Sequence, residues 1–111
     1  MKNRTPEALA QGQLDAYNAH DIDAFCSFFA EDVRVYNAHT NELLFSGQAE
    51  FRRRYTQRFA NADLHCTLIN RMVQGNVVID QESVVGLREG VVQAIAIYHI
   101  EGDLISEVHF Y

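Results

Sequence analysis

The chain of 111 residues is long enough for one domain with a single core and too short for two, so we expect one domain over residues 1–111. Hydrophobic residues make up 48% and charged residues 22%, a balance typical of a soluble globular protein. The formal net charge of −6 argues against a basic surface, so neither nucleic acid nor a membrane is expected as a partner.

The N-terminal segment and the two cysteines indicate in which cellular compartment the protein is expected. The stretch "MKNRTPEALAQ" lacks the apolar centre of a signal peptide, and no apolar run reaches the length of a membrane span. Cys26 and Cys66 match no CxxC pattern of a metal or redox site, so we interpret both as reduced. We therefore expect a cytoplasmic protein.

Two helices are predicted near the N-terminus. Thr5 can cap the first helix, and Pro6 then occupies the first helical position, where its missing N–H costs nothing. Asp21 can cap the second helix in the same way. The apolar face of this second helix is expected to contain Ile22, Phe25, Phe28 and Phe29.

A short strand, an extended segment and a third helix follow. "VRVYNA" (33–38) predicts the strand, and "NELLFSG" (41–47) predicts a second extended segment that ends in a turn. In "SGQAEFRRRYTQRFA" (46–60), Phe51, Tyr55 and Phe59 recur every four residues, which predicts a helix. We interpret its arginines, on the other sides of the helix, as a solvated surface.

From residue 63 the hydrophobic period changes to two. Four strands rich in β-branched and aromatic residues are predicted within 63–74, 76–87, 91–101 and 103–111. Short glycine-containing turns at 74–76, 88–90 and 101–103 separate them, which favours an antiparallel meander. The predicted fold class is α+β, with three helices on one face of a curved antiparallel sheet.

The turns predict which side chains share a face of the sheet. A turn at Gly102–Asp103 pairs Tyr98 with Glu107, and a three-residue loop ending at Gly90 keeps Asp80 and Glu82 on the face of Tyr98. The resulting polar face contains His65, Thr67, Ile69, Arg71, Val78, Asp80, Glu82, Val84, Ala94, Ala96, Tyr98, Ile105, Glu107, His109 and Tyr111. The opposite face is more aliphatic, so periodicity alone leaves open that the polar face points into water.

The order of elements resembles that of a known superfamily. "DIDAFCSFFAEDVRVY", the glycine at Gly47 before the third helix, and the terminal "EGDLI" and "FY" are similar to the NTF2-like superfamily. More narrowly, the whole chain resembles the SnoaL-like and ketosteroid-isomerase-like small proteins. The resemblance implies a cone with a ligand pocket inside the curved sheet. It also implies a homodimer through the convex face, so the polar face would line the pocket.

The residues of ketosteroid isomerases are not all present. The resemblance implies that the catalytic base would fall on Asn37, whose amide accepts no proton at neutral pH. The tyrosine of the oxyanion hole would fall near Gln13, and its acid near Ala96. Steroid isomerisation by the mechanism of that family is therefore not predicted.

A different set of polar groups is predicted to converge in the pocket. The candidate catalytic residues are Asp80, Glu82, Tyr98 and His109. The candidate ligand-binding residues are Gln13, Tyr17, Tyr36, Asn37, Arg71, Ala96, Glu107 and Tyr111. A desolvated pair of carboxyl groups would have at least one raised pKa, which suits general acid or base catalysis. Two structural alternatives stay open: Arg71 and Asp80 as a simple ion pair, and His109 as a hydrogen-bonded core histidine.

The predicted function is a pocket protein for a partly apolar small molecule. Proton transfer next to a carbonyl, as in an isomerase, cyclase or dehydratase, is the first hypothesis. The alternative is a non-catalytic ligand-binding or dimeric interaction domain. An epoxide hydrolase using Asp80, Glu82 and Arg71 is a distant third, because the spacing differs from that of the limonene-epoxide hydrolases. No cofactor is expected, and no metal, because the histidines show no HxH or HExxH spacing.

Overall fold

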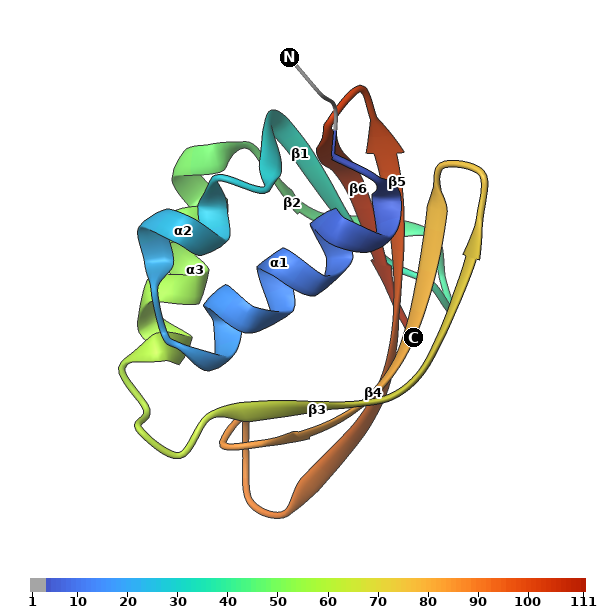
Figure 1. Cartoon of the computed structure of the whole chain (residues 1–111). Helices are drawn as coiled ribbons and strands as arrows, with labels where there is room; N and C mark the ends of the chain where they lie inside the picture. The colour runs from blue at the N-terminus through green and yellow to red at the C-terminus, as the bar shows by residue number, and fades with distance from the viewer. Residues whose placement is uncertain (1–3) are drawn as a thin grey trace.

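The computed structural model describes residues 4–111, with three helices packed on one side of a curved sheet (Figure 1). The helices are α1 (Pro6–Asn18), α2 (Ile22–Cys26) and α3 (Gln48–Phe59). The strands are β1 (Phe29–Asn37), β2 (Glu42–Ser46), β3 (His65–Gln74), β4 (Val77–Val85), β5 (Val91–Glu101) and β6 (Leu104–Phe110). Within the described range, no helix has the length and apolar character needed to cross a membrane.

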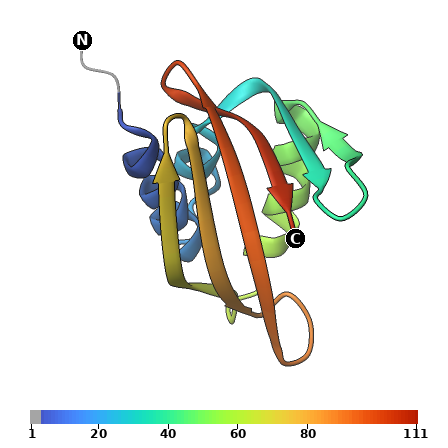
Figure 2. The same ribbon diagram turned by 90° about the vertical axis from the view of Figure 1, so that its right-hand side faces the viewer.

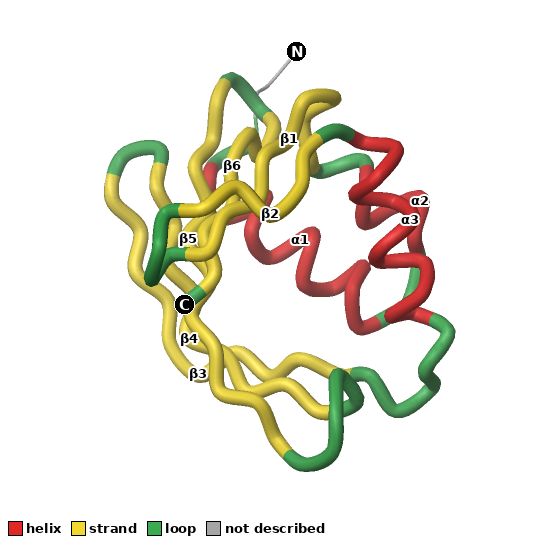
Figure 3. The backbone as a smooth tube through the Cα atoms, turned by 180° about the vertical axis from the view of Figure 1, so that it is seen from behind, coloured by secondary structure: helices red, strands yellow, loops and turns green. Residues whose placement is uncertain are grey.

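The six strands form one sheet in the order β2-β1-β6-β5-β4-β3. All neighbours are antiparallel except β1 and β6, which run parallel, so the sheet is mixed. Figure 2 shows the face of this sheet turned away from the helices, and Figure 3 shows the sheet curving around α1 from behind. The predicted α+β class is confirmed, including the meander of β3 to β6.

The helix starts follow the sequence signals. The Thr5 hydroxyl accepts a hydrogen bond from the Ala8 N–H at 3.1 Å, and the Asp21 carboxylate accepts one from the Ala24 N–H at 3.1 Å. The second helix is shorter than predicted, because Phe29 lies in β1 opposite Ile105 and not on the helix. Strand pairing therefore overrides the helical spacing of the last apolar residues.

The core between helices and sheet is largely aromatic. The rings of Phe25 and Phe51 stack with centroids 5.5 Å apart, and Phe29 and Tyr55 each pack within 5 Å of Phe51. Tyr17 on α1 contacts the edge of Phe59 on α3 at 5.4 Å. This cluster fixes α1 and α3 relative to one another above the concave face of the sheet.

The predicted register between β5 and β6 is correct for the two residue pairs next to the turn and wrong from His99 onward. The turn lies where the sequence placed it, because Glu101 pairs with Leu104. Ser106 is then an extra residue, so Tyr98 lies opposite Val108 and not opposite Glu107. The bulged Ser106 is buried, and its hydroxyl donates a hydrogen bond to the His99 carbonyl at 3.1 Å. A bulge of one residue exchanges the two faces of everything that follows it.

A second bulge changes the start of β3. Arg71 pairs with Asp80 as predicted, but Ile69 is left without a partner and is 55% exposed. Before this bulge, Leu68 lies opposite Glu82 and Cys66 lies opposite Val84. Cys66 and Leu68 therefore lie on the concave face, and the predicted assignment of His65, Thr67 and Ile69 to that face is wrong.

Asn18, the last residue of α1, attaches this helix to β3. Its side-chain amide donates a hydrogen bond to the Cys66 carbonyl and accepts one from the Cys66 N–H, both at 2.8 Å. The side chain thus satisfies both backbone groups of an edge-strand residue, as a neighbouring strand would. The contact holds Cys66 beside the concave face of β4.

Candidate functional site

A cavity of about 280 Å³ lies between the helices and the concave face of the sheet. Its wall is mostly apolar, with a small number of polar side chains, as is usual for small-molecule sites. The lining residues are Gln13, Leu14, Tyr17, Phe25, Phe29, Leu44, Tyr55, Arg58, Cys66, Glu82, Val84, Leu87, Ala94, Tyr98, Val108 and Phe110.

Glu82 is the carboxyl group of this wall. It lies on β4 opposite Ala94, on the concave face, and only 6% of the residue is exposed. Burial, followed by the nearby charge of Asp80, raises the pKa of Glu82 to about 7, against the opposing effects of Cys66 and Arg71. A carboxyl group with this pKa exchanges a proton readily near neutral pH, which is the requirement for a general acid or base.

Tyr98 and Gln13 form the second polar group of the cavity. The Gln13 side-chain amide donates to the Tyr98 hydroxyl oxygen at 3.0 Å and also to the Ala10 carbonyl at 3.0 Å. Burial, followed by the charges of Glu82 and Asp80, raises the pKa of Tyr98 well above its usual value. The hydroxyl therefore stays protonated and, with Gln13 occupying an acceptor position, keeps its own proton to donate.

Asp80 and Arg71 form an ion pair beside the cavity. The guanidinium donates to both carboxylate oxygens, from Nε at 2.7 Å and from the second terminal nitrogen at 2.9 Å. The Asp80 side chain is fully buried and that of Arg71 is 10% exposed, while a third hydrogen bond joins Arg71 to Gln11 at 2.9 Å. Neither residue lines the cavity. The geometry corresponds to the ion-pair alternative in the sequence analysis.

The structure brings some of the predicted site residues together and separates others. Glu82, Tyr98, Gln13 and Tyr17 line the cavity, and Ala96 lies buried on the same face opposite Asp80. The remaining predicted residues, Glu107, His109, Tyr36, Asn37 and Tyr111, are absent from its lining. The roles assigned to all of these residues stay predictions.

The separation follows from the register. Because of the bulge at Ser106, Glu107 and His109 share the convex face with His99 and Ile97, their partners on β5. Tyr36 pairs with His109 across β1 and β6, and their rings stack at 4.7 Å. Placing these three side chains on the concave face was therefore wrong.

The other two residues lie near the ends of their strands. The Asn37 side chain accepts hydrogen bonds from the His39 N–H at 2.8 Å and the Thr40 N–H at 3.3 Å, so it caps the turn after β1. Tyr111 is 60% exposed, and its ring stacks on His39 at 3.8 Å.

Two polar groups of the wall were not predicted. Arg58 was interpreted as solvated surface, yet it is half-buried, lines the cavity and lies over the Tyr55 ring at 4.6 Å. Its spacing of three residues from Tyr55 is a helical spacing that could have indicated this. Cys66 is brought to the wall by the bulge in β3, and burial, followed by Glu82, raises the pKa of its thiol.

The comparisons with known proteins identify the family. Residues 10–108 match the family model of the SnoaL-like domain. The chain belongs to the SnoaL-like domain family. A comparison with curated proteins finds no match.

Solved structures show the same fold as this SnoaL-like chain. A cystatin-fold protein from Novosphingobium aromaticivorans has a TM-score of 0.89 and 23% identity, with 97% of this chain and 98% of that chain covered. A candidate ketosteroid isomerase from Kribbella flavida has a TM-score of 0.82 and 21% identity, covering 97% and 77%. A candidate polyketide cyclase from Sinorhizobium meliloti has a TM-score of 0.79 and 19% identity, covering 93% of each chain. These likenesses confirm the predicted NTF2-like fold.

The buried carboxyl group gives this SnoaL-like protein a specific pH dependence. The pKa of Glu82 rises from 4.5 to about 7 on folding, so between these values the folded state binds more protons than the unfolded state. The stabilisation is complete below pH 4.5 and is lost as pH rises through 7. From pH 5 to pH 8, we expect Glu82 to reduce the free energy of unfolding by roughly 2 kcal/mol.

Urea unfolding of the wild type and Glu82→Gln at several pH values measures this effect. The other titrating groups are common to both proteins, so the difference between the two curves isolates Glu82. We expect the variant to gain stability relative to the wild type as pH rises through the interval. If the free energy of unfolding changed with pH in the same way for both proteins, the pKa of Glu82 would be the same in the folded and unfolded chains, which would contradict this prediction.

Proposed function

We propose that this protein catalyses proton transfer at a carbon next to a carbonyl group, on a small, partly apolar molecule held in the cavity. The observation that carries the proposal is one buried carboxyl group, Glu82, in an otherwise largely apolar cavity wall, where burial raises its pKa to about 7. Tyr98, whose hydroxyl stays protonated, lines the same cavity. The fold shared with a candidate ketosteroid isomerase and a candidate polyketide cyclase supports this class of reaction.

The proposed step uses the two groups in different roles. The Glu82 carboxylate takes a proton from the carbon next to the carbonyl, and the electron pair of that C–H bond moves onto the carbonyl oxygen. Tyr98 donates a hydrogen bond to the resulting enolate oxygen, held in place by Gln13 at 3.0 Å. In a β,γ-unsaturated ketone the enolate is conjugated with the C=C bond, so return of the proton from Glu82 to the γ-carbon isomerises the substrate. In a substrate with a second carbonyl group, attack of the enolate carbon on that carbonyl closes a ring, and the alkoxide so formed takes the proton back from Glu82.

Exchange of the α-protons of 2-tetralone, an apolar bicyclic ketone, for deuterium measures this step directly by NMR. We expect the wild-type protein to accelerate exchange, with a rate that rises with pH as Glu82 ionises near 7. Because general-base catalysis contributes about 10²–10⁴-fold, Glu82→Gln should slow the exchange at least ~100-fold. Tyr98→Phe should slow it less, because the base remains.

Glu101→Gln is the matched control, since this exposed glutamate at the end of β5 lies outside the cavity wall. It should exchange 2-tetralone at the wild-type rate. Equal rates for the wild type and Glu82→Gln would contradict the proposal. If the ketone binds to the wild type and to Glu82→Gln without exchange, the protein is a non-catalytic ligand-binding domain. The differences from the ketosteroid isomerase residues favour this alternative.

We also propose that the convex sheet face forms a homodimer. Ile79 and Ile97 face one another on β4 and β5, Met72 lies beside Ile79, and Met72 is 60% exposed. This aliphatic row supports face-to-face packing of two copies. Sedimentation at micromolar concentration tests the association, and Ile97→Glu should shift a dimer to monomer. A monomeric wild type would contradict it.

We propose a cytoplasmic location. Cys26 and Cys66 are free and buried, as is usual in a reducing compartment. Cell fractionation with a tagged chain tests this location, and recovery in an oxidising compartment would contradict it.

A further inference from the structure

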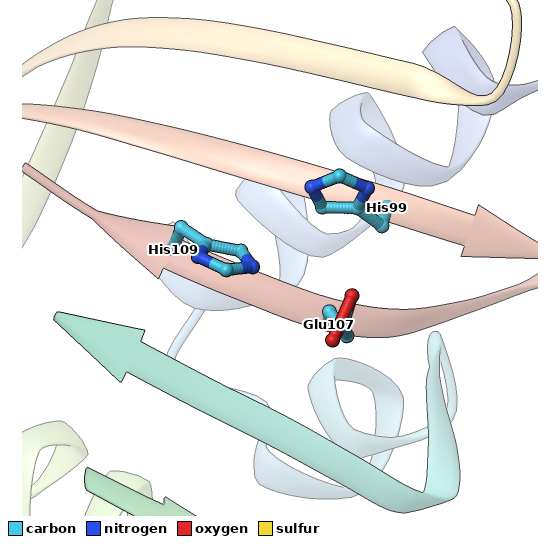
Figure 4. A group of neighbouring side chains, drawn as sticks. All are labelled: His99, Glu107 and His109. Carbon is cyan, nitrogen blue, oxygen red and sulfur yellow. The ribbon is translucent and has the colours of Figure 1, made fainter. Parts of the chain in front are cut away.

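Three potential metal ligands meet on the convex face of the sheet. His99 on β5 lies directly opposite Glu107 on β6, and His109 follows Glu107 by two residues, so all three side chains share one face. Figure 4 shows the two imidazole rings and the carboxylate side by side. Their ligand atoms lie within 4.8 Å of one another, and each residue is half-buried.

The bulge at Ser106 creates this group. In the register without the bulge, His99 would face away from Glu107 and His109. The Ser106 hydroxyl, which donates to the His99 carbonyl at 3.1 Å, holds the two strands in the observed register. The site is on the opposite face of the sheet from Glu82, so it is separate from the proposed catalytic cavity.

We propose that His99, Glu107 and His109 bind a divalent transition-metal ion of the zinc type. Two imidazole nitrogens and one carboxylate oxygen are ligands that suit such ions, while Mg²⁺ and Ca²⁺ prefer oxygen alone. Three protein ligands leave a fourth position for water or another group. The site was not predicted, because the register inferred from the turns put His99 on the opposite face from the other two.

The geometry needs only a small adjustment to close around an ion. With bonds of about 2.0–2.2 Å, neighbouring ligand atoms of a tetrahedral zinc site lie ~3.3 Å apart. The side chains must therefore approach by up to ~1.5 Å, within reach of rotations about their side-chain bonds. The Tyr36 ring stacks on one side of the His109 imidazole, with an angle of 13° between the ring planes.

Arg34 is the competing cation at this site. Its guanidinium lies 3.5 Å from a Glu107 carboxylate oxygen, and both side chains are partly exposed. An ion bound by Glu107 must share or displace this contact. Removing the arginine should therefore strengthen metal binding, whereas it would have no such effect if zinc bound elsewhere.

The other histidines of the chain have different surroundings. His20 contacts the Leu64 carbonyl at 2.7 Å, His39 stacks on Tyr111, and His65 is exposed at the start of β3. None of these belongs to a group of three potential ligands in the described part of the chain. His65 is therefore a suitable control for binding to a single surface histidine.

Calorimetric titration of the purified, tag-free protein with Zn²⁺, and separately with Mg²⁺, tests the proposal. We expect micromolar or tighter Zn²⁺ binding and no measurable Mg²⁺ binding. His99→Ala and His109→Ala should each weaken Zn²⁺ binding at least ~100-fold, since outer-shell changes alone cost about 10–100-fold. His65→Ala should bind as the wild type does, and Arg34→Gln should bind more tightly.

Circular dichroism tests whether each variant is folded. We expect all of them to fold, because the three ligand residues are only half-buried. One ion per chain, or one per two chains if two copies share the site, agrees with the proposal. Absence of Zn²⁺ binding to the wild type would overturn it, as would unchanged binding to His99→Ala and His109→Ala. The visible spectrum of the Co²⁺-loaded protein gives a second readout, and loss of its absorption in His109→Ala should accompany loss of affinity.

Discussion

Replacing Arg71 with methionine is expected to lower the free energy of unfolding at pH 7 by about 3–5 kcal/mol. Arg71 is the partner of Asp80, whose side chain is fully buried. Methionine keeps much of the volume of the arginine stem but donates no hydrogen bond, so the variant leaves a buried carboxylate without its two charged donors. Urea unfolding followed by circular dichroism measures the change.

Two further variants separate the charge from the packing. In Arg71→Met with Asp80→Leu, both charges are absent, so most of the lost stability should return. Arg53→Met breaks the exposed contact with Glu50 and should cost at most ~1 kcal/mol. If Arg71→Met cost no more than Arg53→Met, the ion pair would contribute nothing beyond a surface contact.

Replacing Gly86 with alanine is expected to lower the free energy of unfolding by about 3–5 kcal/mol, from two causes that add. The backbone of Gly86 has φ +89°, a conformation that disfavours any side chain. A methyl group there would also lie 2.5 Å from the Leu64 Cα and 2.6 Å from the Leu64 nitrogen. These are backbone atoms, so no side-chain rotation relieves the contact.

Gly90 in the same loop is the matched control. Its φ of +82° is similar, but a methyl group there would meet nothing within 4 Å. Gly90→Ala should therefore cost only the conformational part, about 1–2 kcal/mol. The difference between the two variants, measured by urea unfolding, isolates the contact of the β4–β5 loop with the turn before β3. Equal losses would contradict that contact.

The side chains of β4 and β5 that lie on the concave face were predicted correctly, because the loop between the two strands determines which side chains share a face. The loop between these strands contains five residues and not three, which moves the partners of Asp80 and Glu82 by two positions. A shift of two leaves the faces unchanged, so Glu82 and Tyr98 lie on the concave face as predicted.

The assignments that were wrong depend on bulges. The turn before β6 is where its glycine predicts it, but Ser106 and Ile69 each add one residue to a strand. No feature of the alternating pattern marks either residue, since serine and isoleucine occur in regular strands too. A bulge bends its strand, so where it occurs depends on how the sheet curves around the helices, which is tertiary structure. Sequence periodicity therefore predicts the strands better than it predicts which of their side chains reach the cavity.

The bulge at Ser106 also has an evolutionary consequence. A strand that gains or loses one residue presents its other set of side chains to the cavity without any substitution. Deleting Ser106 would turn Glu107 and His109 toward the cavity and Val108 and Phe110 away from it. The same segment therefore contains a polar and an apolar set of side chains, and the presence or absence of one residue determines which set faces the cavity. Homologous pockets in this fold can in this way diverge in chemistry through a single codon insertion or deletion.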